Sequence, residues 1–521
     1  CPAQDLGDPA AVFGTSFVSE RKVSQATLTI TALGVYEAKL NGKRVGQFVM
    51  APGWTSYHKR LQYQEYDITD LLTTGQNKIE VTVGKGWYHG RIPGWGGCVY
   101  QDELRARPFG FTAQITLTFE DGSTQILSTD ESWKVSDGPV RLSEIYDGEI
   151  YNATKAPALD QAVTVFDGPT DTLIPQQGEE VHEQERLAVK NSFVTPKGEI
   201  VLDFGQNLTG YVELCVNAKA GDCVDLSFAE VMDKEGNFYT ENYRGAKAQY
   251  HYICKDGVQT WHPSLTFYGF RYIRVNAFPG GVSAAKPEDF TAIAVHSDMK
   301  RTGFLSSSNP LLNQLFSNII WGQKGNFLDV PTDCPQRDER LGWTGDAQVF
   351  VRTACLNYDA EKFFTKWLAD LAADQHEDGY VGHVIPDLLQ SPQASSAWGD
   401  AATVCPWQVY LAFGNPQILR NQYQSMKQWV SYITTTTTTK YLWTGGTHYG
   451  DWLGLDAPSG SYKGSSNEDL IASAFYAYST SLVIKAGTVL GEDVSELKEL
   501  YANIVRTFQE TWPTYNTQTE C

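Results

Sequence analysis

The sequence of 521 residues lacks the patterns that mark several large classes of protein. Its longest apolar runs are too short to cross a bilayer, so no membrane-spanning helix is expected. Its 41 basic residues are outnumbered by 61 acidic ones and form no stripe, so neither nucleic acid nor a membrane is expected as a partner. No Cys-x-x-Cys pair occurs among the nine scattered cysteines, so neither a disulfide framework nor a metal site is expected.

The chain also has no initiator methionine and no signal peptide, and it begins and ends with cysteine. Because both ends interrupt a sequence pattern, we expect a fragment. The cysteine usage favours a reducing compartment, which makes the cytoplasm the expected location. A secreted or periplasmic location is the alternative.

The first part of the chain has the pattern of all-β structure. Residues 1–155 contain short alternating runs, such as 26–32 and 78–83, which are separated by turn signals such as Asn41-Gly42. This spacing predicts a β-sandwich of the jelly-roll kind. Residues 156–300 repeat the pattern after a connector near 156–180, so they predict a second β-sandwich.

The periodicity changes near residue 305, and residues 301–521 predict an all-α domain. Asn309 and Pro310 provide an N-cap and an N1 proline for a first helix. A second helix is predicted from Asp359 to Gln375, with an apolar face. Further helices are predicted at 401–413, 417–435, 467–490 and 494–511. The apolar face of the second helix comprises Phe363, Phe364, Trp367, Leu368 and Leu371.

An acid-rich segment, residues 330–346, interrupts this helical pattern. Two prolines, Pro331 and Pro335, lie in its first part and two glycines, Gly342 and Gly345, in its last part, so we expect a rigid loop throughout. Cleavage of a glycosidic bond needs a carboxyl group that donates a proton, and neighbouring acids raise the pKa of such a group. A structural cluster of ion pairs explains the same local composition equally well. The segment contains Asp333, Arg337, Asp338, Glu339, Arg340, Trp343 and Asp346.

Two later clusters also combine tryptophan, aspartate and glycine. They are Trp398-Gly399-Asp400 and Gly450-Asp451-Trp452. Indole rings cover the C–H faces of sugars, and carboxylates accept hydrogen bonds from sugar hydroxyls. Core packing is the better explanation for any one of these tryptophans, but three such clusters in one helical domain favour a sugar pocket.

At residues 333–346 the sequence resembles the signature of bacterial α-L-rhamnosidases of glycoside hydrolase family 78. Residues 32–46, 51–57 and 86–91 resemble the N-terminal sandwich of that family, and residues 202–210 resemble its second, concanavalin-like sandwich. The resemblance covers nearly the whole chain. It implies an (α/α)6-barrel catalytic domain, a substrate that is a rhamnose-containing glycoside or polysaccharide, and hydrolysis with inversion at the anomeric carbon.

The resemblance also implies roles for individual residues. Glu339 would be the general acid, no cofactor would be needed, and a homodimer is left open. The family's general base follows a tryptophan late in the barrel, whereas this chain has no Trp-Glu pair, so we expect the base beyond residue 521, a barrel that is incomplete at its C-terminus, and an inactive fragment. The residues expected to bind substrate are Asp333, Arg337, Asp338, Trp343, Asp346, Trp398, Asp400, Asp451 and Trp452.

Two other readings stay open. One is a carbohydrate-binding protein without turnover. Its first sandwich could be a sugar-binding module by itself, but packing or a place at the rim explains Trp54, Trp87 and Trp95 better than a binding platform does. The other is a different (α/α)6 enzyme, such as another exo-glycosidase or a lyase. A lyase would need a tyrosine paired with a basic residue, and His383 and His448 are isolated histidines of the kind that are more often structural.

Overall fold

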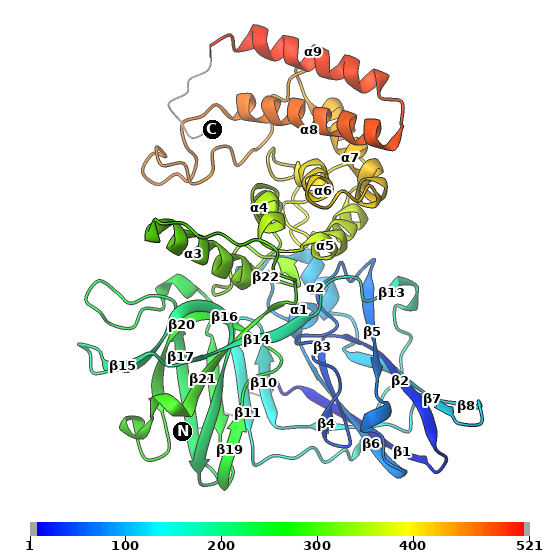
Figure 1. Cartoon of the computed structure of the whole chain (residues 1–521), viewed down its shortest axis with the longest axis vertical. Helices are drawn as coiled ribbons and strands as arrows, with labels where there is room; N and C mark the ends of the chain where they lie inside the picture. The colour runs from blue at the N-terminus through cyan, green and yellow to red at the C-terminus, as the bar shows by residue number, and fades with distance from the viewer. Residues whose placement is uncertain (1–7, 515–521) are drawn as a thin grey trace. The chain divides into compact units, whose positions relative to one another are not determined.

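The computed structural model describes residues 8–514 (Figure 1). The chain forms two compact units. The β-rich unit comprises residues up to Asp298, then Ser307–Asp329 and Cys334–Arg340. The helical unit comprises Met299–Ser306, Val330–Asp333 and the residues from Leu341 onward. The acid-rich segment is therefore divided between the two units.

The N-terminal part of the β-rich unit contains two sheets. Alternate residues of their central strands are buried, among them Leu28, Ile30, Ile79 and Val81, as expected for strands with one face in a core. In hydrogen-bonding order, the six-stranded sheet is β12 (Gln161–Ala162), β9 (Lys134–Asp137), β1 (Ala11–Ser19), β6 (Gly75–Gly84), β3 (Val35–Leu40) and β4 (Lys43–Arg44). The five-stranded sheet is β13 (Leu173–Pro175), β5 (Leu61–Asp67), β2 (Val23–Leu33), β7 (Gly110–Phe119) and β8 (Thr124–Ser128).

The turn between β3 and β4 shows how the sequence determines this topology. Asn41 and Gly42 have φ values of 52° and 78°, as a two-residue hairpin turn of type I′ requires at its two central positions. Trp54 and Trp87 are buried and stack with ring centroids 5.7 Å apart, whereas Trp95 is 52% exposed. The first two are therefore packing residues, as predicted, and Trp95 lies at the surface.

A ten-stranded sheet forms the rest of the β-rich unit. Its longest strand is β16 (Ile200–Ala218), which pairs with four other strands and changes register between Asp203 and Leu208. The sheet order is β10 (Val140–Glu144), β11 (Gly148–Asn152), β18 (Gln249–Ile253), β17 (Cys223–Ala229), β20 (Tyr268–Ala277), β16, β21 (Phe290–Ser297) and β14 (Val181–Ala188), while β15 (Asn191–Val194) and β19 (Gly257–Trp261) also pair with β16.

Short helices connect these strands, and one longer helix belongs to the same unit. Helix α3 (Pro310–Asn326) packs on β16, where Thr209 Oγ1 donates a hydrogen bond of 2.7 Å to the carbonyl oxygen of Gly325. Asn309 caps α3 by accepting from the Leu311 N–H, as predicted. The short helices and the two remaining strands are α1 (Gly86–His89), α2 (Val99–Arg105), η1 (Thr69–Leu71), η2 (Thr170–Thr172), η3 (Glu241–Tyr243), η4 (Val282–Ala284), η5 (Pro287–Asp289), β22 (Phe327–Leu328) and β23 (Val330–Pro331).

In the helical unit the second to the fifth helix each pack on the next helix along the chain, whereas the first helix packs on the third (Figure 1). The apolar face predicted for the second helix is buried in α5, from Phe363 to Leu371. Asn467 caps α8, and Gly414 and Gly491 end α6 and α8 with left-handed φ values of 71° and 78°. The helices are α4 (Thr344–Asn357), α5 (Glu361–Asp374), α6 (Ala401–Phe413), α7 (Gln417–Thr436), α8 (Glu468–Leu490) and α9 (Ser495–Thr511).

Two further observations concern the chain between residues 8 and 514. None of its helices is long and apolar enough to span a membrane. Six of its cysteines are free thiols: Cys98, Cys215, Cys254, Cys334, Cys355 and Cys405.

Candidate active site

The acid-rich segment is a loop over most of its length, but the prediction of a loop up to residue 346 was wrong. Helix α4 begins at Thr344, so Asp346 is an exposed acid in its first turn, where the helix dipole favours a negative charge. Gly345 explains the difference. A Cβ atom at this position would lie 2.5 Å from the indole of Trp398, so glycine is kept for a close approach and not for a turn.

Glu339 lies in the part of the loop that belongs to the β-rich unit, and two arginines hold it. Arg244 Nη2 donates a bond of 2.6 Å to Oε2 of Glu339, and Arg337 Nε donates one of 2.9 Å to the same oxygen. The Glu339 side chain is only 13% exposed. Tyr146 holds the backbone at this point, since its hydroxyl donates to the carbonyl oxygen of Glu339.

Asp338 faces the protein and not the solvent. It is 7% exposed, and its carboxylate forms an ion pair with Arg244 Nε at 3.1 Å and accepts from the Gly245 N–H at 3.2 Å. Its carbonyl oxygen accepts from the Gly94 N–H at 3.0 Å. A Cβ atom on Gly94 or Gly245 would lie 2.3 or 2.5 Å from Asp338, so both glycines make room for it. Asp338 thus anchors Arg244, and its expected contact with a sugar stays a prediction.

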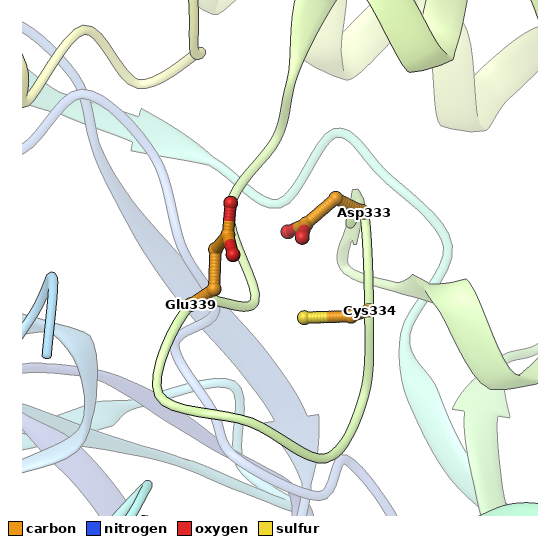
Figure 2. A group of neighbouring side chains, drawn as sticks. All are labelled: Asp333, Cys334 and Glu339. Atoms are coloured by element: carbon orange, nitrogen blue, oxygen red, sulfur yellow. The ribbon is translucent and has the colours of Figure 1, made fainter. Parts of the chain in front are cut away.

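Arg340 has a structural role in the same loop. Its side chain is 1% exposed and donates only to carbonyl oxygens, among them those of Ile145 at 2.9 Å and Phe267 at 2.8 Å. Its backbone N–H donates to Sγ of Cys334 at 3.4 Å. Figure 2 shows Cys334 pointing across the loop toward the limb that carries Glu339. Together these bonds fix the loop against the β-sheets.

In the helical unit, the three predicted tryptophans gather around Tyr449. The ring centroid of Tyr449 lies 4.5 Å from that of Trp398, 5.3 Å from that of Trp452 and 6.2 Å from that of Trp343. Trp398 is 9% exposed and Trp452 is 41% exposed. The structure therefore brings the three indoles together, and their contact with a sugar stays a prediction.

Tyr449 also contacts a buried histidine. Its hydroxyl lies 3.1 Å from Nδ1 of His383, and burial lowers the pKa of His383 to about 4. The imidazole is therefore neutral at neutral pH. Neither Nε2 of His383 nor Nε1 of Trp398 has a hydrogen-bond partner among residues 8–514, although both atoms are buried. Two unsatisfied polar atoms beside one tyrosine are what a pocket for hydroxyl groups would provide.

Asp333 is half-buried in the helical unit and closes the acid-rich loop from that side. Its carboxylate accepts from the Leu341 N–H at 2.9 Å, and its own N–H donates to the Leu341 carbonyl oxygen at 3.0 Å. This pair brings the two ends of the loop together.

Asp400 is a buried acceptor in the structure, and its expected contact with a sugar stays a prediction. The residue is 0% exposed, and its carboxylate accepts from Trp429 Nε1 at 2.9 Å, from Ser479 Oγ at 2.5 Å and from the Ala397 N–H at 2.8 Å. Burial raises the pKa of this carboxyl group. Asp400 is therefore an internal acceptor that fixes the start of α6, because all its acceptor positions point into the protein.

Asp451 is buried as well, at 8% exposed. Its carboxylate accepts from Ser466 Oγ at 3.4 Å, and a Cβ atom on Gly464 would lie 2.8 Å from Oδ2. It shapes the loop that presents Trp452, and its contact with substrate stays a prediction.

Comparison with known proteins covers both units. The family model for the bacterial alpha-L-rhamnosidase N-terminal domain matches residues 21–185, that for the concanavalin-like domain matches residues 193–296, and that for the 6 hairpin glycosidase domain matches residues 300–520. The chain belongs to the bacterial α-L-rhamnosidase family. The predicted fold class, two β-sandwich domains followed by a six-hairpin helical domain, is thereby confirmed.

Individual α-L-rhamnosidases are similar over nearly the whole chain. One from Formosa agariphila is 37% identical over 95% of this chain, and one from Streptomyces avermitilis is 38% identical over 94%. Among solved structures, the α-L-rhamnosidase of Aspergillus terreus aligns with a TM-score of 0.92 at 38% identity, over 98% of this chain and 60% of that one. The chain spans about half the length of the curated relatives, 54% and 47% of the two named here.

Sequence reasoning missed two residues that contact predicted site residues, one in each unit. Tyr449 directly precedes the Gly450-Asp451-Trp452 cluster, so that cluster could have pointed to Tyr449 from the sequence alone. Arg244 lies 95 positions from Glu339 in a loop without a motif, so only the fold reveals it.

Proposed function

We propose that the protein carrying this chain is an α-L-rhamnosidase that releases terminal α-L-rhamnose from glycosides or polysaccharides with inversion. The observation that carries this proposal is a solved relative. The S. avermitilis α-L-rhamnosidase complexed with L-rhamnose aligns over 98% of this chain and 49% of its own, with a TM-score of 0.90 at 35% identity. A family member whose structure was solved with the sugar therefore has a similar fold over nearly all of this chain.

In this mechanism Glu339 is the general acid. It gives its proton to the glycosidic oxygen as the bond from that oxygen to the anomeric carbon breaks, and a water molecule attacks from the opposite face. The carboxylate that remains on Glu339 then has the guanidinium groups of Arg244 and Arg337 beside it. The second carboxyl group, which activates the water, is expected to follow residue 521, and this stays a prediction.

The sugar itself would be held by the residues around Tyr449. Indole and phenol rings offer apolar faces for the ring hydrogens and for the methyl group of rhamnose. The unsatisfied Nε2 of His383 and Nε1 of Trp398 offer polar atoms for its hydroxyls. The expected role of Asp333, Arg337 and Asp346 in binding rhamnose is part of the same proposal.

The test is Glu339→Gln in the full-length protein. Hydrolysis of rhamnosides with poor leaving groups should be abolished, whereas p-nitrophenyl rhamnoside should lose less, because a good leaving group needs less protonation. Glu199→Gln is a matched control, since Glu199 lies in the same unit, is 17% exposed and pairs with Arg274 at 2.7 Å. Nuclear magnetic resonance of fresh product should show β-L-rhamnose. Equal, small losses on both substrates would remove Glu339 from the role, and rhamnose binding without turnover in the unmutated protein would favour a binding protein.

A further inference from the structure

Arg244 has a backbone conformation that few residues other than glycine adopt. Its φ is 53° and its ψ is −116°, and it directly follows the short helix η3. Side chains with a Cβ atom are strained in this region, and such strain persists where the surrounding structure enforces it. Glycine adopts this backbone conformation without the strain, and the next residue, Gly245, is a glycine. The strained position is nevertheless occupied by an arginine.

The side chain of Arg244 links two consecutive acids. Nε lies 3.1 Å from Oδ1 of Asp338, and Nη2 lies 2.6 Å from Oε2 of Glu339. Asp338 is held in turn by the Gly245 N–H, which follows Arg244 in the chain. One carboxylate therefore orients the guanidinium, and the guanidinium then orients the other carboxylate. The planar fork of arginine suits this arrangement, whereas the point charge of lysine does not.

Two guanidinium groups contact Glu339 within the β-rich unit, and Sγ of Cys334 lies within 4.8 Å of a carboxylate oxygen of Glu339. Arg337 approaches Oε2 from the loop itself, and Arg244 approaches the same oxygen from the loop after η3. Arg91 contacts the loop that carries Arg244, because it donates a hydrogen bond of 2.9 Å to the carbonyl oxygen of Gly245. Arg91 also forms an ion pair with Asp147. Arg244 is thus part of a fixed network, although its side chain is 46% exposed.

We propose that Arg244 is a positioning residue for Glu339, which fixes the direction of the Glu339 carboxyl group and stabilises the carboxylate left after proton donation. The inference rests on the proposed role of Glu339 as general acid. Arg244 itself transfers no proton, since the guanidinium stays protonated throughout. The strained backbone is then the cost of placing a guanidinium at this point of the loop.

Three variants of the full-length protein test the proposal. In Arg244→Met, kcat on a rhamnoside with a poor leaving group should fall on the order of 10-fold, with a smaller fall on p-nitrophenyl rhamnoside. KM should stay close to that of the unmutated protein, because Arg244 acts on the Glu339 carboxyl group and not on the sugar. Arg244→Lys should restore part of kcat on both substrates. Arg244→Gly should reproduce the kinetic loss while its melting temperature stays equal or rises, because glycine relieves the strained backbone.

Arg271→Met is the matched control, since Arg271 pairs with Asp203 at 2.8 Å in the same unit and is 38% exposed. If Arg244→Met lowers kcat no more than this control does, or if both substrates lose activity equally together with a fall in melting temperature, Arg244 is a structural residue only. That result would leave the proposed function intact. If Glu339→Gln instead lost the same small share of activity on substrates with poor and with good leaving groups, the proposed function itself would be refuted.

Discussion

The indole N–H of Trp429 donates a hydrogen bond of 2.9 Å to Oδ1 of Asp400 inside the helical unit. Ser479 donates to the same carboxylate oxygen, and the Ala397 N–H donates to the other one. The carboxylate thus joins α6 to α7 and α8 from within. An aspartate that appears beside a tryptophan and a glycine in the sequence is here part of the framework behind the aromatic residues.

Asp400→Asn should lower the stability of the protein more than it lowers the affinity for rhamnose. An amide group keeps one acceptor oxygen but turns an NH2 group toward a donor, so one buried donor is left unsatisfied. We expect the free energy of unfolding to fall by about 1–3 kcal/mol in urea titrations. Glu499→Gln, at an exposed position on α9, should change little. A stable Asp400→Asn protein that has lost rhamnose affinity would contradict this assignment.

Trp452→Ala should weaken rhamnose binding with little loss of stability. Trp452 is 41% exposed, and its ring lies beside those of Tyr449 and Tyr462, so the exposed part of its indole can contact a sugar. Loss of an aromatic contact should cost on the order of 1–3 kcal/mol in calorimetric titration with rhamnose. Trp95→Ala removes a tryptophan that is 52% exposed in the β-rich unit and serves as the control. Equal affinities for the two variants would exclude Trp452 from the pocket.

Gly345→Ala should destabilise the protein although alanine is the better helix former. Its Cβ atom would lie 2.5 Å from the indole of Trp398, and a ring that is 9% exposed has little room to move. Gly322→Ala in α3 is the matched control, since nothing lies within 4 Å of its Cβ position. That variant should gain about 0.5–1 kcal/mol. Thermal unfolding of both variants tests this prediction. A gain in the stability of Gly345→Ala would contradict the close packing of α4 on Trp398.

The parts of this fold that follow local periodicity could be predicted from the sequence. The apolar spacing of α5 and the Asn309 cap of α3 are local signals, and both appear in the structure. Helix α4 was missed because Gly345 has a long-range reason, the packing of Trp398, that a local pattern cannot show. For the same reason the pattern around Asp400 could not tell an inward carboxylate from an outward one. Arg244 contacts Glu339 only in the folded chain, because 95 positions separate the two residues in the sequence.

His383 should make the stability of the protein depend on pH. Burial, which is the largest cause, lowers its pKa from 6.5 to about 4, against the opposing charge of Asp387. The unfolded chain therefore binds a proton between these values that the folded protein does not bind. The stabilisation is complete above pH 6.5 and is lost as the pH falls toward 4. It amounts to about 3 kcal/mol, from a shift of that size at 1.36 kcal/mol per pH unit.

His383→Asn should therefore flatten the acid side of the stability profile, measured by urea unfolding followed with far-ultraviolet circular dichroism at several pH values between 4 and 7. His182 provides a control of opposite sign. Its bond to Glu180 raises its pKa, so its contribution is present at low pH and is lost as the pH rises. His182→Asn should consequently steepen the acid loss, whereas His383→Asn should reduce it. If both variants changed the slope in the same direction, the neutral, buried state of His383 beside Tyr449 would be refuted, and with it the polar side of the proposed rhamnose pocket.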